Sequence, residues 1–235
     1  VLAFTRLGEQ VIIQPPVYPP FFSCISTLNR QAALNPLLLV DGQYRMDFAG
    51  LERCAANGAR LLILCSPHNP VGRVWTPDEL QQVLAIARRY QLVVLADEIH
   101  ADLVYLGNRH HCLATLAQAD DLLVTAVAPS KTFNIAGMGL ASLIAANPAH
   151  RAALKQAFAS LHIGESNPFS ITAFEAAYRH GEPWLNELLP YLQANLDYVR
   201  DYIRRYLAPI ALIEPEGTYL LWLDCRALGL NDQDL

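Results

Sequence analysis

Three runs of consecutive apolar residues constrain the fold of this chain most strongly. They cover Leu61–Cys65, residues 92–96 and residues 122–127, and each has the length of a β-strand rather than of a helix. A strand that is apolar on both faces must be covered on both faces, which is typical of parallel sheets flanked by helices. The sequence therefore predicts an α/β fold with a mainly parallel sheet sandwiched by helices.

A helix is predicted between the first two runs, over residues 76–90. Thr76 can cap it, Pro77 suits the first helical position, and Glu79 completes a capping box. Apolar residues then recur at i, i+3, i+4 and i+7 and form one face: Leu80, Val83, Leu84 and Ala87. An amphipathic helix between two buried strands is the unit from which parallel sheets are built.

The rest of the chain extends this alternation of strands and helices. We expect further strands at Gln10–Ile13 and residues 140–146, and a long helix over Glu182–Tyr206. Residues 1–5 have the pattern of the inside of a helix. Neither end of the chain carries the signals of a natural start or stop, so we expect the chain to be truncated at both ends.

The pattern changes after Pro209, which predicts two domains. Short strand-like pieces follow at Ala211–Ile213 and at residues 219–223, around a turn. We expect residues 1–207 to form a large domain whose N-terminal part is missing. Residues 208–235 are expected to begin a smaller α+β C-terminal domain.

Composition excludes several classes of protein. The formal net charge is -5 and the basic residues form no stripe, so nucleic acid is not expected as a partner. No apolar run approaches the roughly 20 residues that cross a bilayer, so no membrane partner is expected. The five cysteines show neither a paired motif nor a metal-ligand spacing. They predict reduced thiols in a cytoplasmic protein, and no metal site.

Polar residues follow the three apolar runs where the strands are predicted to end. Asn69 lies shortly after the first run, Asp97 directly follows the second, and Lys131 lies shortly after the third. In open α/β sheets ligands bind beyond the carboxyl ends of the strands, so these side chains are expected at one site. A partly buried lysine can act as a Schiff-base nucleophile, and a strand-end acid can hold a protonated pyridine nitrogen. The neighbouring acids Glu98 and Asp102 are expected on the solvated start of a helix.

Five short motifs surround these residues. Three follow the apolar runs: Ser66-Pro67-His68-Asn69-Pro70-Val71-Gly72, Asp97-Glu98-Ile99-His100 and Ala128-Pro129-Ser130-Lys131-Thr132-Phe133-Asn134. The other two are Pro16-Val17-Tyr18-Pro19-Pro20-Phe21 and Pro215-Glu216-Gly217-Thr218-Tyr219. Together they resemble the class I/II aminotransferase superfamily and, more closely, its cystathionine β-lyase (PatB/MalY-type C–S lyase) branch. The resemblance covers essentially the whole chain, and it implies an aminotransferase-like large domain that binds pyridoxal 5'-phosphate (PLP).

The resemblance implies a role for each matching residue. Lys131 would carry PLP as a Schiff base and later move the α-proton of the substrate. Asp97 would pair with the pyridine nitrogen, and Asn69 would donate to the phenolic oxygen of the ring. Tyr18 would stack on the face of the ring, and Ser130 would bind the phosphate.

Two positions distinguish this chain from many aminotransferases. His100 stands where many of them have a tyrosine near the phenolic oxygen, and we expect it to contact the cofactor. Gly139, eight residues after the lysine, stands where many have an arginine that clamps the phosphate. This difference favours the lyase branch. The Asn69-Pro70 peptide bond is expected to be cis. The family's Gly-containing phosphate segment would precede the first residue, and its arginine for the substrate carboxylate would follow the last.

The expected function is that of a PLP-dependent C–S β-lyase, with Lys131 as the catalytic residue. It would cleave L-cystathionine or another L-cysteine S-conjugate to a thiol, pyruvate and ammonia. Two alternatives stay open. One is a class I/II aminotransferase that acts on an amino acid and a 2-keto acid, and the other is a regulatory binding protein or an inactive fragment. The resemblance also implies a homodimer in which the partner subunit completes each site.

Overall fold

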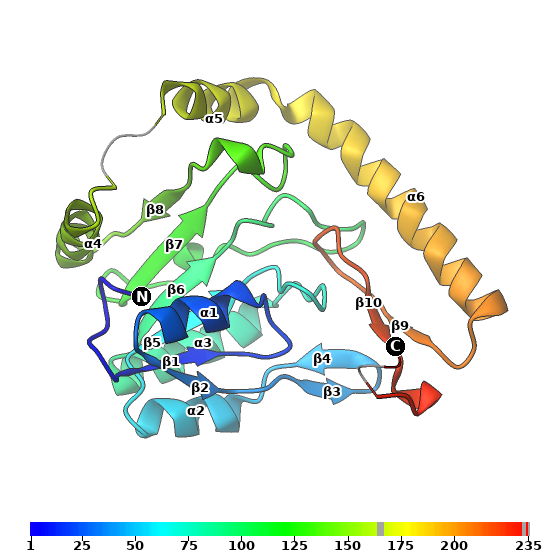
Figure 1. Cartoon of the computed structure of the whole chain (residues 1–235), viewed down its shortest axis with the longest axis horizontal. Coiled ribbons are helices and arrows are strands. Elements are labelled where there is room, and N and C mark those ends of the chain that lie inside the picture. Colours follow the sequence, from blue (N-terminus) through cyan, green and yellow to red (C-terminus); the bar gives the residue numbers. More distant parts are fainter. Residues whose placement is uncertain (164–166, 232–233, 235) are drawn as a thin grey trace.

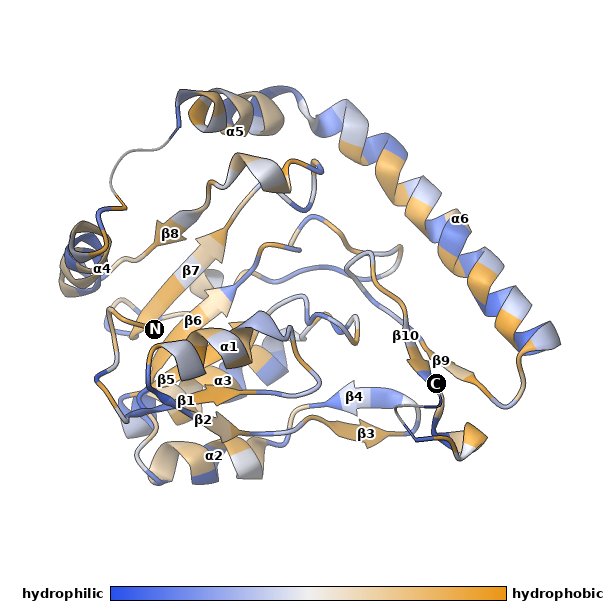
Figure 2. Cartoon of the chain, in the orientation of Figure 1, coloured by the Kyte–Doolittle hydropathy of each residue, from blue (hydrophilic) through white to orange (hydrophobic). Residues whose placement is uncertain are grey.

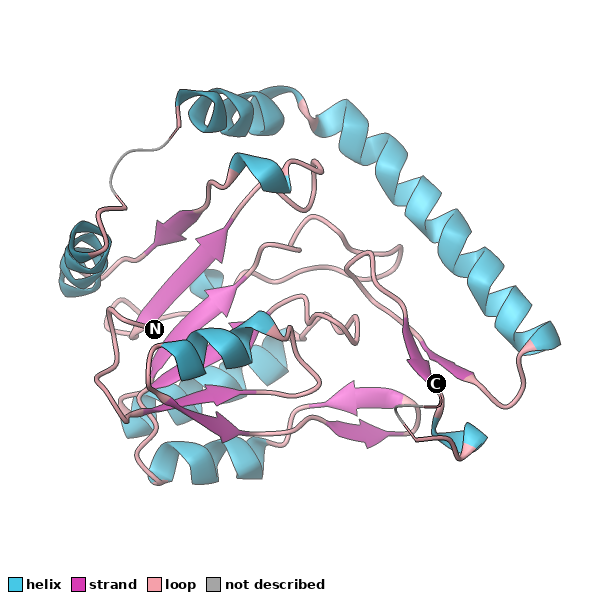
Figure 3. Ribbon diagram, viewed as in Figure 1, coloured by secondary structure: helices cyan, strands magenta, loops and turns pink. Residues whose placement is uncertain are grey.

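A six-stranded sheet forms the centre of the computed structural model, which describes residues 1–163, 167–231 and 234 (Figure 1). Its strand order is β2-β1-β5-β6-β7-β8. Neighbouring strands pair in parallel except β7 and β8, which run antiparallel at one edge (Figure 3). The predicted α/β class with a mainly parallel sheet is therefore confirmed. In spatial order the strands cover Gln31–Leu34, Gln10–Ile13, Leu61–Cys65, Val93–Asp97, Leu123–Val127 and Ser142–Ile144.

Three helices cover the two faces of the sheet. Helix α1 (Pro20–Thr27) lies on one face, and α2 (Phe48–Ala56) and α3 (Pro77–Tyr90) lie on the other (Figure 1). All of β5 is buried, because successive side chains of a strand point to opposite faces and both faces are covered. The central strands are correspondingly apolar (Figure 2). Two side chains of β5 pack on the α2–α3 side and three on the α1 side: Leu62 and Leu64, then Leu61, Ile63 and Cys65.

Helix α3 begins where its sequence predicts. The hydroxyl of Thr76 accepts a hydrogen bond from the amide of Glu79 at 3.2 Å, and the Glu79 carboxylate accepts one from the Thr76 amide at 2.9 Å. This reciprocal capping box satisfies two backbone groups at the start of the helix. The predicted apolar face is buried against the sheet.

Three further helices follow β8 and run around the edge of the sheet: α4 (Pro148–Ser160), α5 (Pro168–His180) and α6 (Glu182–Tyr206) (Figure 1). Large apolar side chains on these helices are exposed, among them Phe158, Phe169, Ile171, Trp184, Tyr191 and Tyr198. Within the part of the chain that the structure describes, no helix combines the length and apolarity needed to span a bilayer.

Two antiparallel strand pairs lie beside the main sheet. Strand β3 (Leu38–Val40) pairs with β4 (Gln43–Arg45), and β9 (Ala211–Ile213) pairs with β10 (Trp222–Asp224). The indole N–H of Trp222 in β10 donates to the hydroxyl of Tyr44 in β4 at 3.3 Å. The two strand pairs are therefore neighbours in space (Figure 1). The division into a large domain of residues 1–207 and the beginning of a second domain stays a prediction. The described part of the chain also contains short 3-10 helices at Leu113–Thr115 (η1), Ala136–Met138 (η2) and Arg226–Leu228 (η3).

The prediction of helical structure at residues 1–5 is wrong. These residues form a turn in which the amide of Thr5 donates to the carbonyl of Val1 at 3.1 Å. The turn does not continue into a helix because Arg30 binds both the hydroxyl and the carbonyl oxygen of Thr5. Gly8 then adopts a φ of 78°, in the left-handed region that helices do not use.

Two predicted strands differ in extent. The one expected at residues 140–146 is limited to Ser142–Ile144, and the one expected at residues 219–223 is shifted to Trp222–Asp224. The shift has a local cause, since the amide of Leu220 donates to the hydroxyl of Thr218 at 3.1 Å and turns the chain before it can extend.

Replacing Thr76 with alanine should lower the free energy of unfolding by about 1 kcal/mol, because the backbone amide of Glu79 then loses its partner, the Thr76 hydroxyl. Urea denaturation of the two proteins measures this difference. Gln81→Ala is a matched control, since Gln81 is exposed on the same helix. Equal losses in both variants would show that the cap contributes nothing specific.

Candidate active site at the carboxyl ends of three strands

The parallel pairing of β5, β6 and β7 brings the predicted site residues to one edge of the sheet. Cys65 at the end of β5 lies opposite Asp97 at the end of β6, and Asp97 lies opposite Ala126 of β7. The segments that leave these strands therefore start side by side. They carry Asn69, His100 and Lys131.

Lys131 lies close to both Asp97 and His100. It is half-buried, and its positive charge acts on both neighbours. Burial raises the pKa of Asp97 to about 6, against smaller lowering effects from the amide of Ile99 and from Lys131. Burial, followed by the charge of Lys131, lowers the pKa of His100 to about 4. An amine, a carboxyl group of raised pKa and a neutral imidazole thus lie together at the strand ends.

His100 is buried without hydrogen-bond partners. The residue is only 2% exposed, and neither ring nitrogen has a partner among the described residues. Its ring contacts that of Tyr219, with the two centroids 5.3 Å apart and an angle of 60° between the ring planes. Buried polar groups in folded proteins are nearly always paired, so a buried imidazole of this kind indicates a site for a bound molecule.

Asn69 and Tyr18 are joined at the same edge. The amide of Tyr18 donates to the carbonyl of Asn69 at 3.1 Å, and the amide of Asn69 donates to the sulfur of Cys65 at 3.3 Å. The Asn69-Pro70 bond is cis, as expected. Tyr18 is 37% exposed as a residue, and its ring makes an edge contact with Phe21 at 5.7 Å between centroids.

Ser130 and Lys131 lie in a hydrogen-bonded turn after β7. The carbonyl of Ser130 accepts from the amide of Ile135 at 3.1 Å, and Phe133 closes the same turn by donating to Pro129 at 2.9 Å. The turn fixes the backbone on both sides of the lysine.

The sequence did not identify the residues that anchor this turn. Thr132, fully buried, donates through its hydroxyl to the carboxylate of Asp102 at 2.9 Å. Its carbonyl accepts from the indole of Trp184, at the start of α6, at 3.1 Å. The available signal was the position of Thr132 directly after the lysine, but its partners lie 30 and 52 residues away.

The expectation of a solvated helix start around Glu98 is wrong. Glu98 is only 3% exposed, and its carboxylate accepts from the amide of Leu113 at 2.9 Å and contacts Nε2 of His110 at 3.1 Å. The chain after β6 forms turns and then folds back, so this carboxylate meets a later segment instead of water. Within the described residues, no group of three histidine, cysteine or acidic side chains is placed to hold a metal ion.

This geometry supports amine chemistry. A half-buried lysine can condense with an aldehyde, and a carboxylate at a strand end can hold a protonated ring nitrogen. The family model "Aminotransferase class I and II" matches residues 1–235. The chain belongs to the class I and II aminotransferase family. The branch indicated by its motifs is also confirmed by its relatives.

Two curated relatives belong to that branch. The chain is 40% identical to cystathionine beta-lyase PatB of Bacillus subtilis, over 100% of this chain and 61% of that protein. It is 35% identical to protein MalY of Escherichia coli, over 99% of this chain and 60% of that protein. The chain therefore spans about three fifths of the length of these relatives.

A solved structure with the same fold is that of cystalysin from Treponema denticola, which contains a pyridoxal 5'-phosphate cofactor. Its TM-score with this chain is 0.95 at 37% identity, over 99% of this chain and 59% of that one. The strand ends described above are thus part of a fold that this family shares.

Asp97→Asn should stabilise the cofactor-free protein at pH 7 to 8 by roughly 1–3 kcal/mol, because the folded protein then no longer buries an ionised carboxylate. The pKa of Asp97 rises from 3.8 to about 6 on folding. The free energy of unfolding of the wild type should therefore fall as the pH rises from 3.8 through about 6. Urea denaturation between pH 4 and 8 measures the effect.

Comparing wild type with Asp97→Asn separates the pH dependence of stability due to Asp97 from that due to two buried histidines. Burial lowers the pKa of His68 and of His100 to about 4. Their contribution to the free energy of unfolding therefore falls as the pH falls, opposite to that of Asp97. A difference between wild type and Asp97→Asn that does not change from pH 4 to pH 8 would contradict the prediction.

Proposed function

We propose that the full-length protein is a PLP-dependent C–S β-lyase. It would convert L-cystathionine or another L-cysteine S-conjugate to a thiol, pyruvate and ammonia. The observation that carries this proposal is the cluster of Lys131, Asp97 and His100 at the carboxyl ends of β6 and β7. The curated relatives named cystathionine beta-lyase support the choice of reaction.

The residues present fit PLP. The half-buried carboxylate of Asp97 and the two ring nitrogens of His100, which are buried and have no hydrogen-bond partner among the described residues, lie at the strand ends near the lysine. When bound, PLP supplies an electron-accepting ring that stabilises negative charge on the α-carbon of an amino acid. Asp97 would accept a hydrogen bond from the ring nitrogen, and Asn69 and His100 would contact the phenolic oxygen. Tyr18 would stack on the ring, and Ser130 would bind the phosphate.

Lys131 has two tasks in this proposal. Its amine would hold the cofactor covalently, and the free Nζ would take the proton from the α-carbon of the substrate. The turn from Pro129 to Ile135 holds the lysine for this step, and the partners of Thr132 anchor that turn.

Aminotransferase activity is the second candidate, because the family contains such enzymes. Gly139 argues against it. This residue directly follows η2 and has a φ of 60°, a conformation that glycine adopts readily and arginine does not. The backbone conformation at this position therefore suits the glycine of this chain better than the arginine that many aminotransferases have there.

We also propose that the protein acts as a homodimer in the cytoplasm. The exposed apolar side chains of α4 and α5 support a partner surface. The five cysteines are free thiols, which is the state expected in a reducing compartment.

Product analysis tests the reaction. The full-length protein with PLP and L-cystathionine should release thiol, pyruvate and ammonia without any added keto acid. If the products instead form only when a 2-keto acid is added, with little thiol, the protein is an aminotransferase.

Lys131→Ala should abolish the visible absorbance of lysine-bound PLP and reduce turnover by at least about a hundredfold, because the variant lacks the amine that transfers the proton. Borohydride reduction followed by peptide mass mapping should locate PLP on Lys131 in the wild type. Lys155→Ala is the control, since Lys155 is the other lysine of this chain and is exposed on α4. Retention of the absorbance in Lys131→Ala would refute the assignment.

A further inference from the structure

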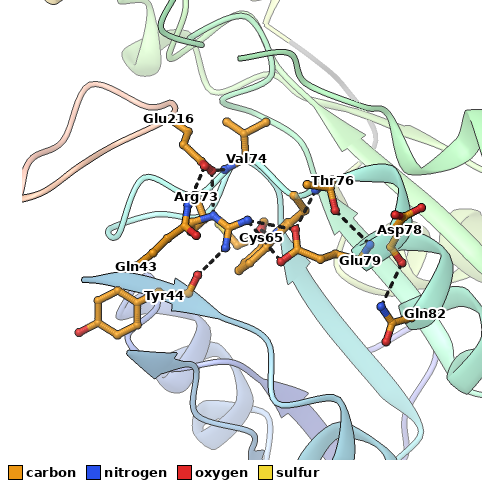
Figure 4. Close-up of polar contacts among 11 residues, drawn as sticks. Gln43, Tyr44, Cys65, Arg73, Val74, Thr76, Asp78, Glu79, Gln82 and Glu216 are labelled. Carbon is orange, nitrogen blue, oxygen red and sulfur yellow. Dashed lines mark hydrogen bonds and ion pairs between the residues drawn. The ribbon is translucent and has the colours of Figure 1, made fainter. Parts of the chain in front are cut away.

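The turn between β9 and β10 is held to the large domain through Glu216. One carboxylate oxygen of Glu216 accepts from Nε of Arg73 and from the amide of Val74, both at 2.8 Å. The other oxygen accepts from the side-chain amide of Gln43 at 2.9 Å (Figure 4). One side chain thus binds two segments, the loop after β5 and strand β4, that precede it by more than a hundred residues.

The guanidinium of Arg73 is buried and needs more than one partner. Its side chain is 5% exposed, and besides Glu216 it contacts the carboxylate of Glu79 at 3.0 Å and the carbonyl of Tyr44 (Figure 4). It also lies over the ring of Trp75, 4.8 Å from the centroid. A buried charge is tolerated only when it is well paired, so the position of Glu216 is tightly determined.

The backbone of the same turn is bound on both sides. The amides of Glu216 and Gly217 donate to the carbonyl of Gly72 at 2.8 and 2.9 Å, and the amide of Thr218 donates to Leu103 at 2.7 Å. The fit leaves no room for side chains. A Cβ on Gly72 would lie 2.6 Å from Pro215, and one on Gly217 would lie 2.9 Å from the carbonyl of Leu103.

Tyr219 directly follows this clamped turn. The centroid of its ring lies 5.3 Å from that of His100, and the residue is 39% exposed. His100 is the buried imidazole beside Lys131. Glu216 is therefore linked to the candidate site through the bound turn, the ring of Tyr219 and the ring of His100.

We propose that Glu216 is a positioning residue: by clamping residues 215–218 to the large domain it sets Tyr219 against His100 and so fixes one wall of the site. The catalytic consequence rests on the proposed function. The placement of Tyr219 does not, and the two can be tested separately.

The placement is tested by the imidazole NMR signals of His100 in the full-length protein without cofactor, assigned by their loss in His100→Gln. Tyr219→Ala removes the ring current acting on His100 and should shift these signals. Glu216→Ala should shift them in the same direction, and Glu216→Gln should give a smaller shift because it keeps an acceptor for the amide of Val74. Unmoved signals in Glu216→Ala, or in Tyr219→Ala, would overturn the proposal.

A matched control lies two residues away. Glu214 makes a bidentate ion pair with Arg200 of α6, with both distances at 2.8 Å, but this pair does not involve the turn. Glu214→Ala should leave the His100 signals in place. A shift as large as that of Glu216→Ala would show that any loss of charge in this segment disturbs the site, and would overturn the specific role of Glu216.

The catalytic consequence is tested with the PLP-loaded protein. Glu216→Ala and Tyr219→Ala should each lower kcat/KM by roughly ten- to a hundredfold, while the visible absorbance of bound PLP is kept. The double variant should be little worse than either single variant, because both changes act through one ring. If the double variant instead lost kcat/KM by the product of the two single losses, the proposal would be overturned. Absence of PLP absorbance in the wild type would count against the proposed function, and the NMR result would still decide the placement.

Discussion

Strands β5, β6 and β7 pair in parallel with Cys65 opposite Asp97 and Asp97 opposite Ala126. Because of this register, the three segments that leave the strands begin at the same edge of the sheet. The lysine, the acid and the imidazole of the candidate site meet there without a specific long-range bond between them. A change of register by one residue would turn each strand's buried side chains to the opposite face, so packing on both faces protects the site.

The site contains polar groups in unfavourable states. Asp97 is half-buried, and the loss of solvent raises its pKa to about 6, while both ring nitrogens of His100 lack partners among the described residues. Such groups cost stability in the cofactor-free protein and become favourable when a ligand supplies the missing partners. The same residues that make the apo fold less stable are thus those that fit a charged, hydrogen-bonding cofactor.

A second set of interactions joins the turn after β9 to strand β4 and to the loop after β5. Arg73 is surrounded by Glu79, Glu216, the ring of Trp75 and a carbonyl of β4. Two of these partners are local to the loop and helix that follow β5, and the others come from distant parts of the chain. The buried charge of Arg73 therefore links the start of the predicted second domain to the loop that carries Asn69.

The sequence by itself determined the central architecture. Continuous apolar runs required a sheet covered on both faces, and Thr76 with Glu79 set the start of α3, because these effects depend on neighbouring residues alone. The strand-end positions of Asn69, Asp97 and Lys131 followed from the same pattern. Tertiary structure decided the burial of Glu98, the anchoring of Thr132 and the contact of Tyr219 with His100. Each of these contacts involves a partner that is distant in the sequence. No local sequence pattern specifies which distant segment will pack against a given residue.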